Sequence, residues 1–157
     1  EYKSKSDRPF RIIDAPNTTI GKARQIGLEE SNGNILAYID SDVELPHENW
    51  IGNMLKPFAD EKVGGTQTLA KNRDSDPEIL KKIHFSFEYA STVIDMDHYE
   101  TVGTSHILLR KSAVTEVGGF KDINFGEDAD LTFRMMKAGY KFIYLPTEKC
   151  YHYHVDG

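Results

Sequence analysis

The sequence predicts a layered α/β domain built around one sheet, and three observations lead to this fold class. Short apolar runs alternate with longer stretches of helical periodicity, so strands and helices follow one another along the chain. The 157 residues are 39% hydrophobic and 28% charged, which suits a globular domain with its own core. No internal repeat or linker divides the chain. We therefore expect a single domain over residues 1–157.

The first third of the chain predicts two strands and two helices. A short strand is expected at Phe10–Ile13. Thr19 can cap a helix over Ile20–Glu30, because its hydroxyl can accept a hydrogen bond from the first helical turn. The near-continuous apolarity of Asn34–Ile39 predicts a central strand that is covered on both faces. Pro46 then begins a second helix.

The remaining two thirds continue the alternation. Four strands are expected there, at Lys62–Ala70, His106–Leu109, Tyr140–Leu145 and Cys150–His154. Three helices are expected between them, at Pro77–Asp95, Ser112–Val117 and Asp128–Ala138. Glycines end the last two helices, as is common where the chain leaves a helix in a left-handed conformation.

The overall charge limits the classes of partner. A net charge of −6 argues against nucleic acid as the main partner, because phosphate backbones need a basic surface. A nucleotide remains compatible, since a bound cation can supply the positive charge. The single cysteine, Cys150, suits a reducing compartment, and no apolar stretch approaches the roughly 20 residues of a membrane span. We expect a cytoplasmic protein and leave peripheral membrane attachment and the oligomeric state open.

The triplet Asp40-Ser41-Asp42 is the most informative feature of the sequence. The chain contains three other Asp-x-Asp triplets, but only this one directly follows a predicted strand and precedes a turn. Open α/β sheets place ligands at such strand ends. Two carboxylates there can share a divalent cation, which in turn can neutralise a diphosphate. The alternative is an ordinary solvated turn.

Two further segments carry chemistry. Four carboxylates fall within nine residues, at Asp122, Glu127, Asp128 and Asp130. A carboxylate beside a cleft can act as a general base, although acidic residues also favour the first turn of a helix for electrostatic reasons alone. In the tail, His152 and His154 alternate at strand period and so face the same side. A neutral imidazole can complete a cation site, while the alternative is a half-exposed strand face without a ligand.

Read in order, these features resemble the family 2 glycosyltransferases over nearly the whole chain. The resemblance implies the glycosyltransferase-A fold, a Rossmann-like three-layer α/β/α sandwich with a mixed, mostly parallel sheet. Each matching segment alone is common, but their order is specific. The segments are Asn17–Gly27, Ile35–Asp42, Gly103–Arg110, Gly118–Phe120, Gly126–Leu131, Arg134–Tyr140 and Pro146–His154.

The resemblance also implies roles for residues on the donor side. Asp40 would contact the ribose or uracil side of a nucleotide sugar and share a cation, Mg²⁺ or Mn²⁺, with Asp42. His152 is the expected third protein ligand of that cation, with His154 as the alternative. Arg24 and Lys22 would lie near the donor phosphates.

On the acceptor side, the resemblance implies that Asp128 is the catalytic base. Glu127 would position the acceptor or support the base, and Gly103 and Thr104 would line the acceptor site. The implied function is an inverting glycosyltransferase that moves a sugar from a UDP- or GDP-sugar to a hydroxyl of a saccharide or lipid-linked acceptor. Two alternatives stay open: a nucleotidyltransferase that makes sugar nucleotides, and a non-catalytic module that binds sugar or a partner through the aromatic segment His84–Tyr89.

Two departures from the family pattern stand out. Gln25 occupies a supporting position where the family usually has asparagine. The family's first strand, and the aspartate-rich strand end that holds the nucleobase, would precede Glu1. The resemblance therefore implies an N-terminally truncated domain that could lack activity on its own. Within it, residues 1–45 would be the remaining nucleotide-binding part and residues 46–157 the metal- and acceptor-binding part.

Overall fold

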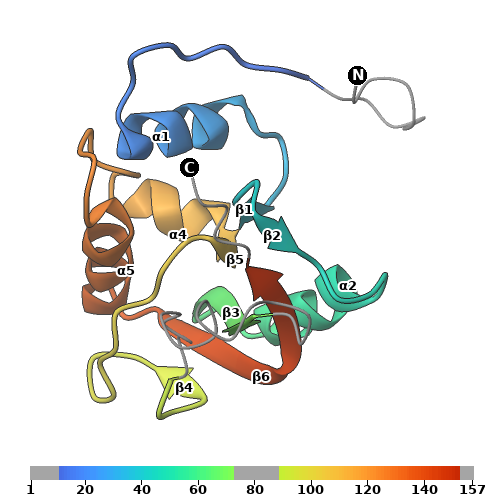
Figure 1. The fold of residues 1–157 in the computed structure, drawn as a ribbon. Helices are drawn as coiled ribbons and strands as arrows, with labels where there is room; N and C mark the ends of the chain where they lie inside the picture. Colours follow the sequence, from blue (N-terminus) through green and yellow to red (C-terminus); the bar gives the residue numbers. More distant parts are fainter. Residues whose placement is uncertain (1–10, 73–88, 153–157) are drawn as a thin grey trace.

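A computed structural model describes residues 11–72 and 89–152 of the chain (Figure 1). The strands in these ranges form one sheet in the order β1-β5-β3-β6-β2, and β4 also pairs with β6. Their bounds are β1 Ile35–Ile39, β2 Val43–Glu44, β3 Val63–Lys71, β4 Val93–Ile94, β5 His106–Arg110 and β6 Lys141–His152. The helices are α1 Ile20–Glu30, α2 Trp50–Leu55, η2 Lys56–Ala59, α4 Lys111–Glu116 and α5 Glu127–Lys137.

The sheet lies between two helical layers, so the three-layer expectation is confirmed. Residues of α1, α4 and α5 pack with one face of the sheet in the larger apolar cluster, while α2 covers the other face. Figure 1 shows α1, α4 and α5 grouped on one side of the strands and α2 on the opposite side. Within the described residues, no helix is long and apolar enough to cross a membrane.

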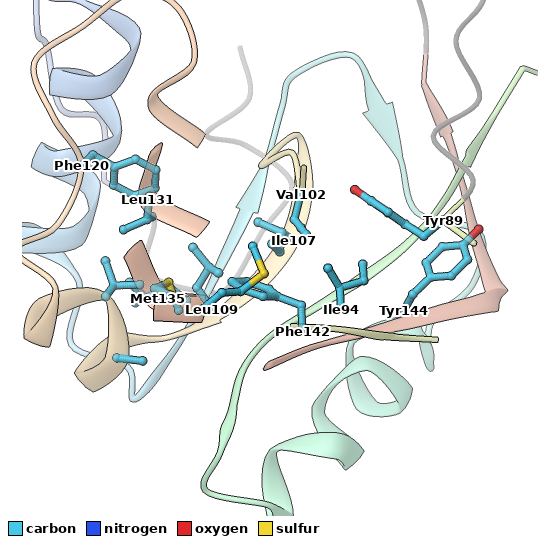
Figure 2. Packing of buried hydrophobic residues seen from close by; sticks show 14 of the residues in the cluster. Tyr89, Ile94, Val102, Ile107, Leu109, Phe120, Leu131, Met135, Phe142 and Tyr144 are labelled. Carbon is cyan, nitrogen blue, oxygen red and sulfur yellow. The ribbon is translucent and has the colours of Figure 1, made fainter. Parts of the chain in front are cut away.

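The core is continuous along the sheet face that supports α5. Figure 2 shows Phe120 and Leu131 at one end of the larger cluster and the rings of Tyr89 and Tyr144 at the other. These two tyrosine rings meet edge to face with centroids 4.9 Å apart. A smaller cluster on the other face centres on Trp50, which is fully buried. Because apolar side chains pack on both faces, the positions of the central strands are fixed. The positions of the strand ends, where polar residues gather, are fixed with them.

The strand directions differ from the expectation of a mostly parallel sheet. Among the described strands only β3 and β6 pair in parallel, whereas β1–β5, β3–β5, β2–β6 and β4–β6 are antiparallel. The alternation of strands and helices predicts the layers, but strand direction depends on how each connection enters the sheet. Here β5 lies between β1 and β3 and runs against both, which makes two of the antiparallel pairs.

Two strand predictions are corrected by the sheet order. The strand predicted at Asn34–Ile39 exists as β1, but in the described chain it ends the sheet order and pairs with β5 alone. The last two predicted strands are a single strand, β6, which continues through Pro146. The β3–β6 register shifts between Thr68 and Ala70, opposite Leu145 and Cys150, so the proline sits in an irregularity of the ladder. Proline is tolerated there because it lacks an N–H to donate.

Three local predictions also need correction. Residues 11–13 of the predicted strand Phe10–Ile13 form no strand, and Phe10 lies outside the described residues. Of the predicted helix Pro77–Asp95, residues 77–88 lie outside the described ranges, and residues 89–95 are not helical but contain β4. The Asp95 carboxylate accepts hydrogen bonds from the backbone N–H groups of residues 97 and 98, a side-chain turn that competes with helix.

The start of α1 is fixed against the loop that leads into α5. The Gly21 N–H donates to the carbonyl of Ile123 at 3.0 Å, and a side chain at Gly21 would collide with the Lys121 carbonyl. The Gln25 amide oxygen accepts the Phe120 N–H at 2.9 Å, so glutamine at this position still supports the turn. These contacts hold the N-terminus of α5, with Glu127 and Asp128, close to α1.

Candidate active site

A cavity of about 170 Å³ lies where β1 ends, at the start of β5 and the N-terminus of α5. Six of the residues singled out from the sequence line it, which brings the two acidic segments together. The cavity is lined by Arg24, Asp40, Gln67, Tyr89, Gly103, Thr104, Ser105, His106, Asp128 and His152.

Asp40 is positioned by the pairing of β1 and β5. Its backbone N–H donates to the Ser105 carbonyl at 2.8 Å, which extends the ladder by one residue, and its own carbonyl accepts the Val43 N–H in a tight turn. Partial burial raises the pKa of the Asp40 carboxyl, Arg24 opposes the rise, and Asp42 adds to it. The pKa of Asp40 therefore responds to nearby charges, and a cation that enters the cavity would lower it.

Asp42 and His152 face each other across the β2–β6 pair. The ladder sets Val43 opposite His152, so Asp42 Oδ1 lies 3.2 Å from His152 Nε2. Two ligands on adjacent corners of an octahedral cation with bonds of about 2.1 Å are separated by about 3 Å. This pair therefore fits two positions around Mg²⁺ or Mn²⁺.

Asp40, the remaining proposed metal ligand, does not join the Asp42–His152 pair. Its carboxylate contacts Arg24 instead, with 3.5 Å between Nη2 and Oδ1. Within residues 11–72 and 89–152, no group of three His, Cys, Asp or Glu side chains is close enough to hold a metal. A cation at this place would have two protein ligands, and donor phosphates and water would fill the other positions, as is usual for Mg²⁺. The alternative ligand His154 lies outside the described residues.

Arg24 connects the Asp-x-Asp segment with the start of α5. Its guanidinium group forms an ion pair with Glu127 and also approaches Asp40. The side chains of Arg24 and Glu127 are only 15% and 6% exposed, so each charge depends on the other for compensation. Glu127 itself does not line the cavity, and Lys22 is exposed on α1 outside it.

Asp128 enters the cavity from the first turn of α5. Gly126 caps this helix in a left-handed conformation with φ 75°, and the Ala129 N–H donates to Asp128 Oδ1 at 2.7 Å. The other oxygen, Oδ2, lies against Gly103, where a β-carbon would come within 3.6 Å of it. Because Gly103 has no side chain, the space in front of this oxygen stays open. Asp128 can therefore accept a proton from a group bound in the cavity.

The cavity also contains polar residues that sequence analysis did not identify as site residues. Gln67 is buried in the middle of β3, and its amide group donates to the Gly103 carbonyl at 2.8 Å. Thr104, predicted from the sequence, is 1% exposed, and its hydroxyl has no hydrogen-bond partner among the described residues. Ser105 and His106, the next two residues in the chain, also line the cavity. Polar residues within or beside buried strands are the signal that could have revealed this group.

The aromatic segment His84–Tyr89 contributes one described residue, since residues 84–88 lie outside the described ranges. Tyr89 packs in the core and lines the cavity at the same time. Burial raises the pKa of its phenol to about 12. The ring is therefore a neutral wall of the cavity at physiological pH.

This architecture, with an Asp-x-Asp triplet at a strand end facing a helix-borne carboxylate, is that of a glycosyltransferase-A domain. Two solved structures share the fold. Mannosyltransferase PcManGT from Pyrobaculum calidifontis, in complex with GDP-Man and Mn²⁺, has a TM-score of 0.60 and 19% identity over 84% of this chain and 35% of that one. S. aureus TarS, in complex with UDP, has a TM-score of 0.62 and 16% identity over 85% of this chain and 39% of that one.

The sequence comparison defines the family. The pattern of glycosyl transferase family 2 matches residues 1–118, so the chain belongs to this family and the resemblance read from its motifs is confirmed. A curated relative, the pre-mycofactocin glycosyltransferase of Mycobacterium tuberculosis (strain CDC 1551 / Oshkosh), is 29% identical over 139 residues, or 84% of this chain. The chain spans 29% of that relative's length.

Proposed function

We propose that this chain carries the reaction centre of an inverting glycosyltransferase that moves a sugar from a nucleoside diphosphate sugar to an acceptor hydroxyl. The observation that carries the proposal is the meeting of Asp40, Asp128 and His152 around one cavity. Membership of the family supports it, as does the name of the curated relative. The solved structures with GDP-Man and with UDP favour a GDP- or UDP-sugar as the donor.

Asp128 is the proposed base. Its Oδ2 side faces the cavity beside Gly103, where an acceptor hydroxyl can approach, and Thr104 is part of the same cavity wall. As the acceptor oxygen attacks the anomeric carbon, Asp128 takes its proton, and the nucleoside diphosphate leaves from the opposite face. The transition state is oxocarbenium-like, as in other glycosyl chemistry. A single attack of this kind inverts the anomeric centre.

The donor side is proposed to rest on Asp40, Asp42 and His152. Asp42 and His152 would hold Mg²⁺ or Mn²⁺, which supplies positive charge for the departing diphosphate when bound. Asp40 faces the cavity from the end of β1 and would accept hydrogen bonds from the ribose or base side of the nucleotide. Lys22 would approach the phosphates from the solvent side of α1, and Arg24 from within the cavity.

Glu127 is proposed to act through Arg24 and not by touching the acceptor. Because the Arg24 guanidinium is bound to Glu127 and lies 3.5 Å from Asp40, its position is set from both sides of the cavity. Residues 1–45 thus supply the nucleotide-side groups, while residues 46–157 supply the base, the histidine and the acceptor wall. The acceptor is proposed to be a saccharide or a lipid-linked acceptor.

The test is Asp128→Asn in the full-length protein, with sugar transfer and donor binding measured separately. Transfer should fall by at least about 100-fold, since a general base contributes about that much, whereas donor affinity should stay the same. Asp130→Asn is the matched control, because Asp130 pairs with Lys121 and Arg134 outside the cavity. Full transfer activity in Asp128→Asn would disprove the assignment of the base.

A further inference from the structure

His106 is a buried histidine that the proposed reaction does not use. It begins β5, is 1% exposed, and its ring lies between two oxygen atoms. Nε2 is 3.0 Å from the Thr68 carbonyl oxygen, and Nδ1 is 2.7 Å from the Ser105 hydroxyl oxygen. Both distances are those of good hydrogen bonds, so the ring is fixed on both sides.

The partners of His106 determine where its proton lies. A carbonyl oxygen can only accept, so Nε2 carries the hydrogen and donates to Thr68. Burial lowers the pKa of His106 to about 4, which keeps the ring neutral at physiological pH. In a neutral imidazole the other nitrogen is an acceptor. The Ser105 hydroxyl must therefore donate its hydrogen to Nδ1.

This arrangement leaves Ser105 with only acceptor capacity. Its one hydroxyl hydrogen is committed to His106, while the lone pairs of the oxygen remain. Ser105 lines the cavity, and in the described part of the chain its hydroxyl makes no second hydrogen bond. Without His106, the same hydroxyl could rotate and donate. The histidine thus turns an adaptable group into one that can only receive a hydrogen bond.

Ser105 stands directly beside Asp40. The Asp40 N–H donates to the Ser105 carbonyl, and both residues line the same cavity. An ionised Asp40 carboxylate is also an acceptor only. Two acceptors that line one cavity match a ligand that offers two hydroxyl hydrogens, and they disfavour a ligand that offers lone pairs at these positions.

We propose that Ser105, held by His106, is a specificity-determining acceptor for a hydroxyl of the bound nucleotide sugar, next to the hydroxyl taken by Asp40. The inference rests on the proposed function, because it assumes a nucleotide sugar in this cavity. The hydroxyl belongs either to the ribose or to the transferred sugar, and both offer neighbouring hydroxyl groups. Ser105 is thus a binding residue, and His106 is a positioning residue that acts through it.

The test is calorimetric binding to the full-length protein and its Ser105→Ala variant with Mn²⁺ present. The probes are UDP, 2′-deoxy-UDP, UDP-glucose, GDP, 2′-deoxy-GDP and GDP-mannose. Loss of one neutral hydrogen bond should weaken binding about fivefold. If the ribose is the partner, the loss appears already with UDP or GDP; it vanishes with the 2′-deoxy form when Ser105 binds the 2′-hydroxyl and persists when Ser105 binds the 3′-hydroxyl. If the sugar is the partner, the loss appears only with UDP-glucose or GDP-mannose.

Two controls separate binding from folding. Ser91→Ala removes another partly buried serine hydroxyl, which accepts the Val93 N–H outside the cavity, and should leave every affinity unchanged. Nitrogen NMR of the free protein should show His106 protonated at Nε2, with a shifted Nδ1 signal in Ser105→Ala.

The inference and the proposed function fail in different ways. If the unmodified protein binds a probe and Ser105→Ala binds all six probes equally well, the inference about Ser105 is wrong while the proposed function stands. If His106 is protonated at Nδ1, the acceptor assignment is wrong, whatever the protein binds. If the unmodified protein binds none of the six probes, both the proposed function and this inference are overturned.

Discussion

Removal of the Arg24 side-chain charge should destabilise the fold strongly. Arg24→Met keeps most of the aliphatic bulk but leaves the Glu127 carboxylate, whose side chain is 6% exposed, without its cationic partner. Breaking a buried pair from one side typically costs about 3–5 kcal/mol. Because domains of this size are stable by about 5–15 kcal/mol, the variant should lose a large part of its free energy of unfolding.

The assay is urea unfolding at pH 7, followed by circular dichroism, for the unmodified protein, Arg24→Met, Glu127→Gln and the double variant. Glu127→Gln should cost less than Arg24→Met, since Arg24 still has Asp40 at 3.5 Å. The double variant should recover part of the loss, with a coupling free energy of about 1–3 kcal/mol.

The ion pair between Lys141 and Asp60 provides a control double-mutant cycle. Its side chains are 35% and 48% exposed, so its coupling free energy should be much smaller. A coupling of less than about 0.5 kcal/mol between Arg24 and Glu127 would refute the reasoning, because the two charges would then not depend on each other. The reasoning would also be refuted if the coupling free energies of the Arg24–Glu127 and Lys141–Asp60 pairs were equal.

Two further predictions concern acid stability and a turn. The pKa of His106 falls from 6.5 unfolded to about 4 folded, so its contribution is complete above about pH 6.5 and is lost progressively as the pH falls from there to about 4. The urea midpoint should therefore drop more between pH 7 and 4.5 in the unmodified protein than in His106→Gln; equal drops would contradict this. Gly119→Ala should lower the thermal midpoint by several degrees, because Gly119 has φ 72° and faces the Gln25 amide, whereas Gly52→Ala, in open space, should not. Equal midpoints for these two glycine variants would contradict the strain at Gly119.

Features encoded by neighbouring residues were predictable. Thr19 was expected to cap the helix Ile20–Glu30, and the structure confirms it with a 3.0 Å hydrogen bond from the Lys22 N–H to its hydroxyl. The signal is local, since the capping residue and its partner lie three positions apart. The strand before Asp40 and the helix that carries Asp128 were recognisable for the same reason.

Features that depend on distant residues were not predictable in this way. The position of β1 in the sheet order of the described residues and the single run of β6 are set by pairing partners far along the chain. The same holds for the ion pair of Arg24 with Glu127 and for the bond from His106 to Thr68. Residue type and spacing identify candidate site residues at strand ends. Which residue each charged side chain pairs with depends on the tertiary packing.

The central claim is that the end of β1 holds a nucleoside diphosphate through a divalent cation. The most direct measurement is calorimetric titration of the full-length protein with UDP and GDP, with and without Mn²⁺, beside Asp42→Ala. Asp97→Ala, from another Asp-x-Asp triplet outside the cavity, is the control. The account predicts metal-dependent binding of one nucleotide that survives in Asp97→Ala and is lost in Asp42→Ala. Binding that needs no metal, or that is unchanged in Asp42→Ala, would contradict it.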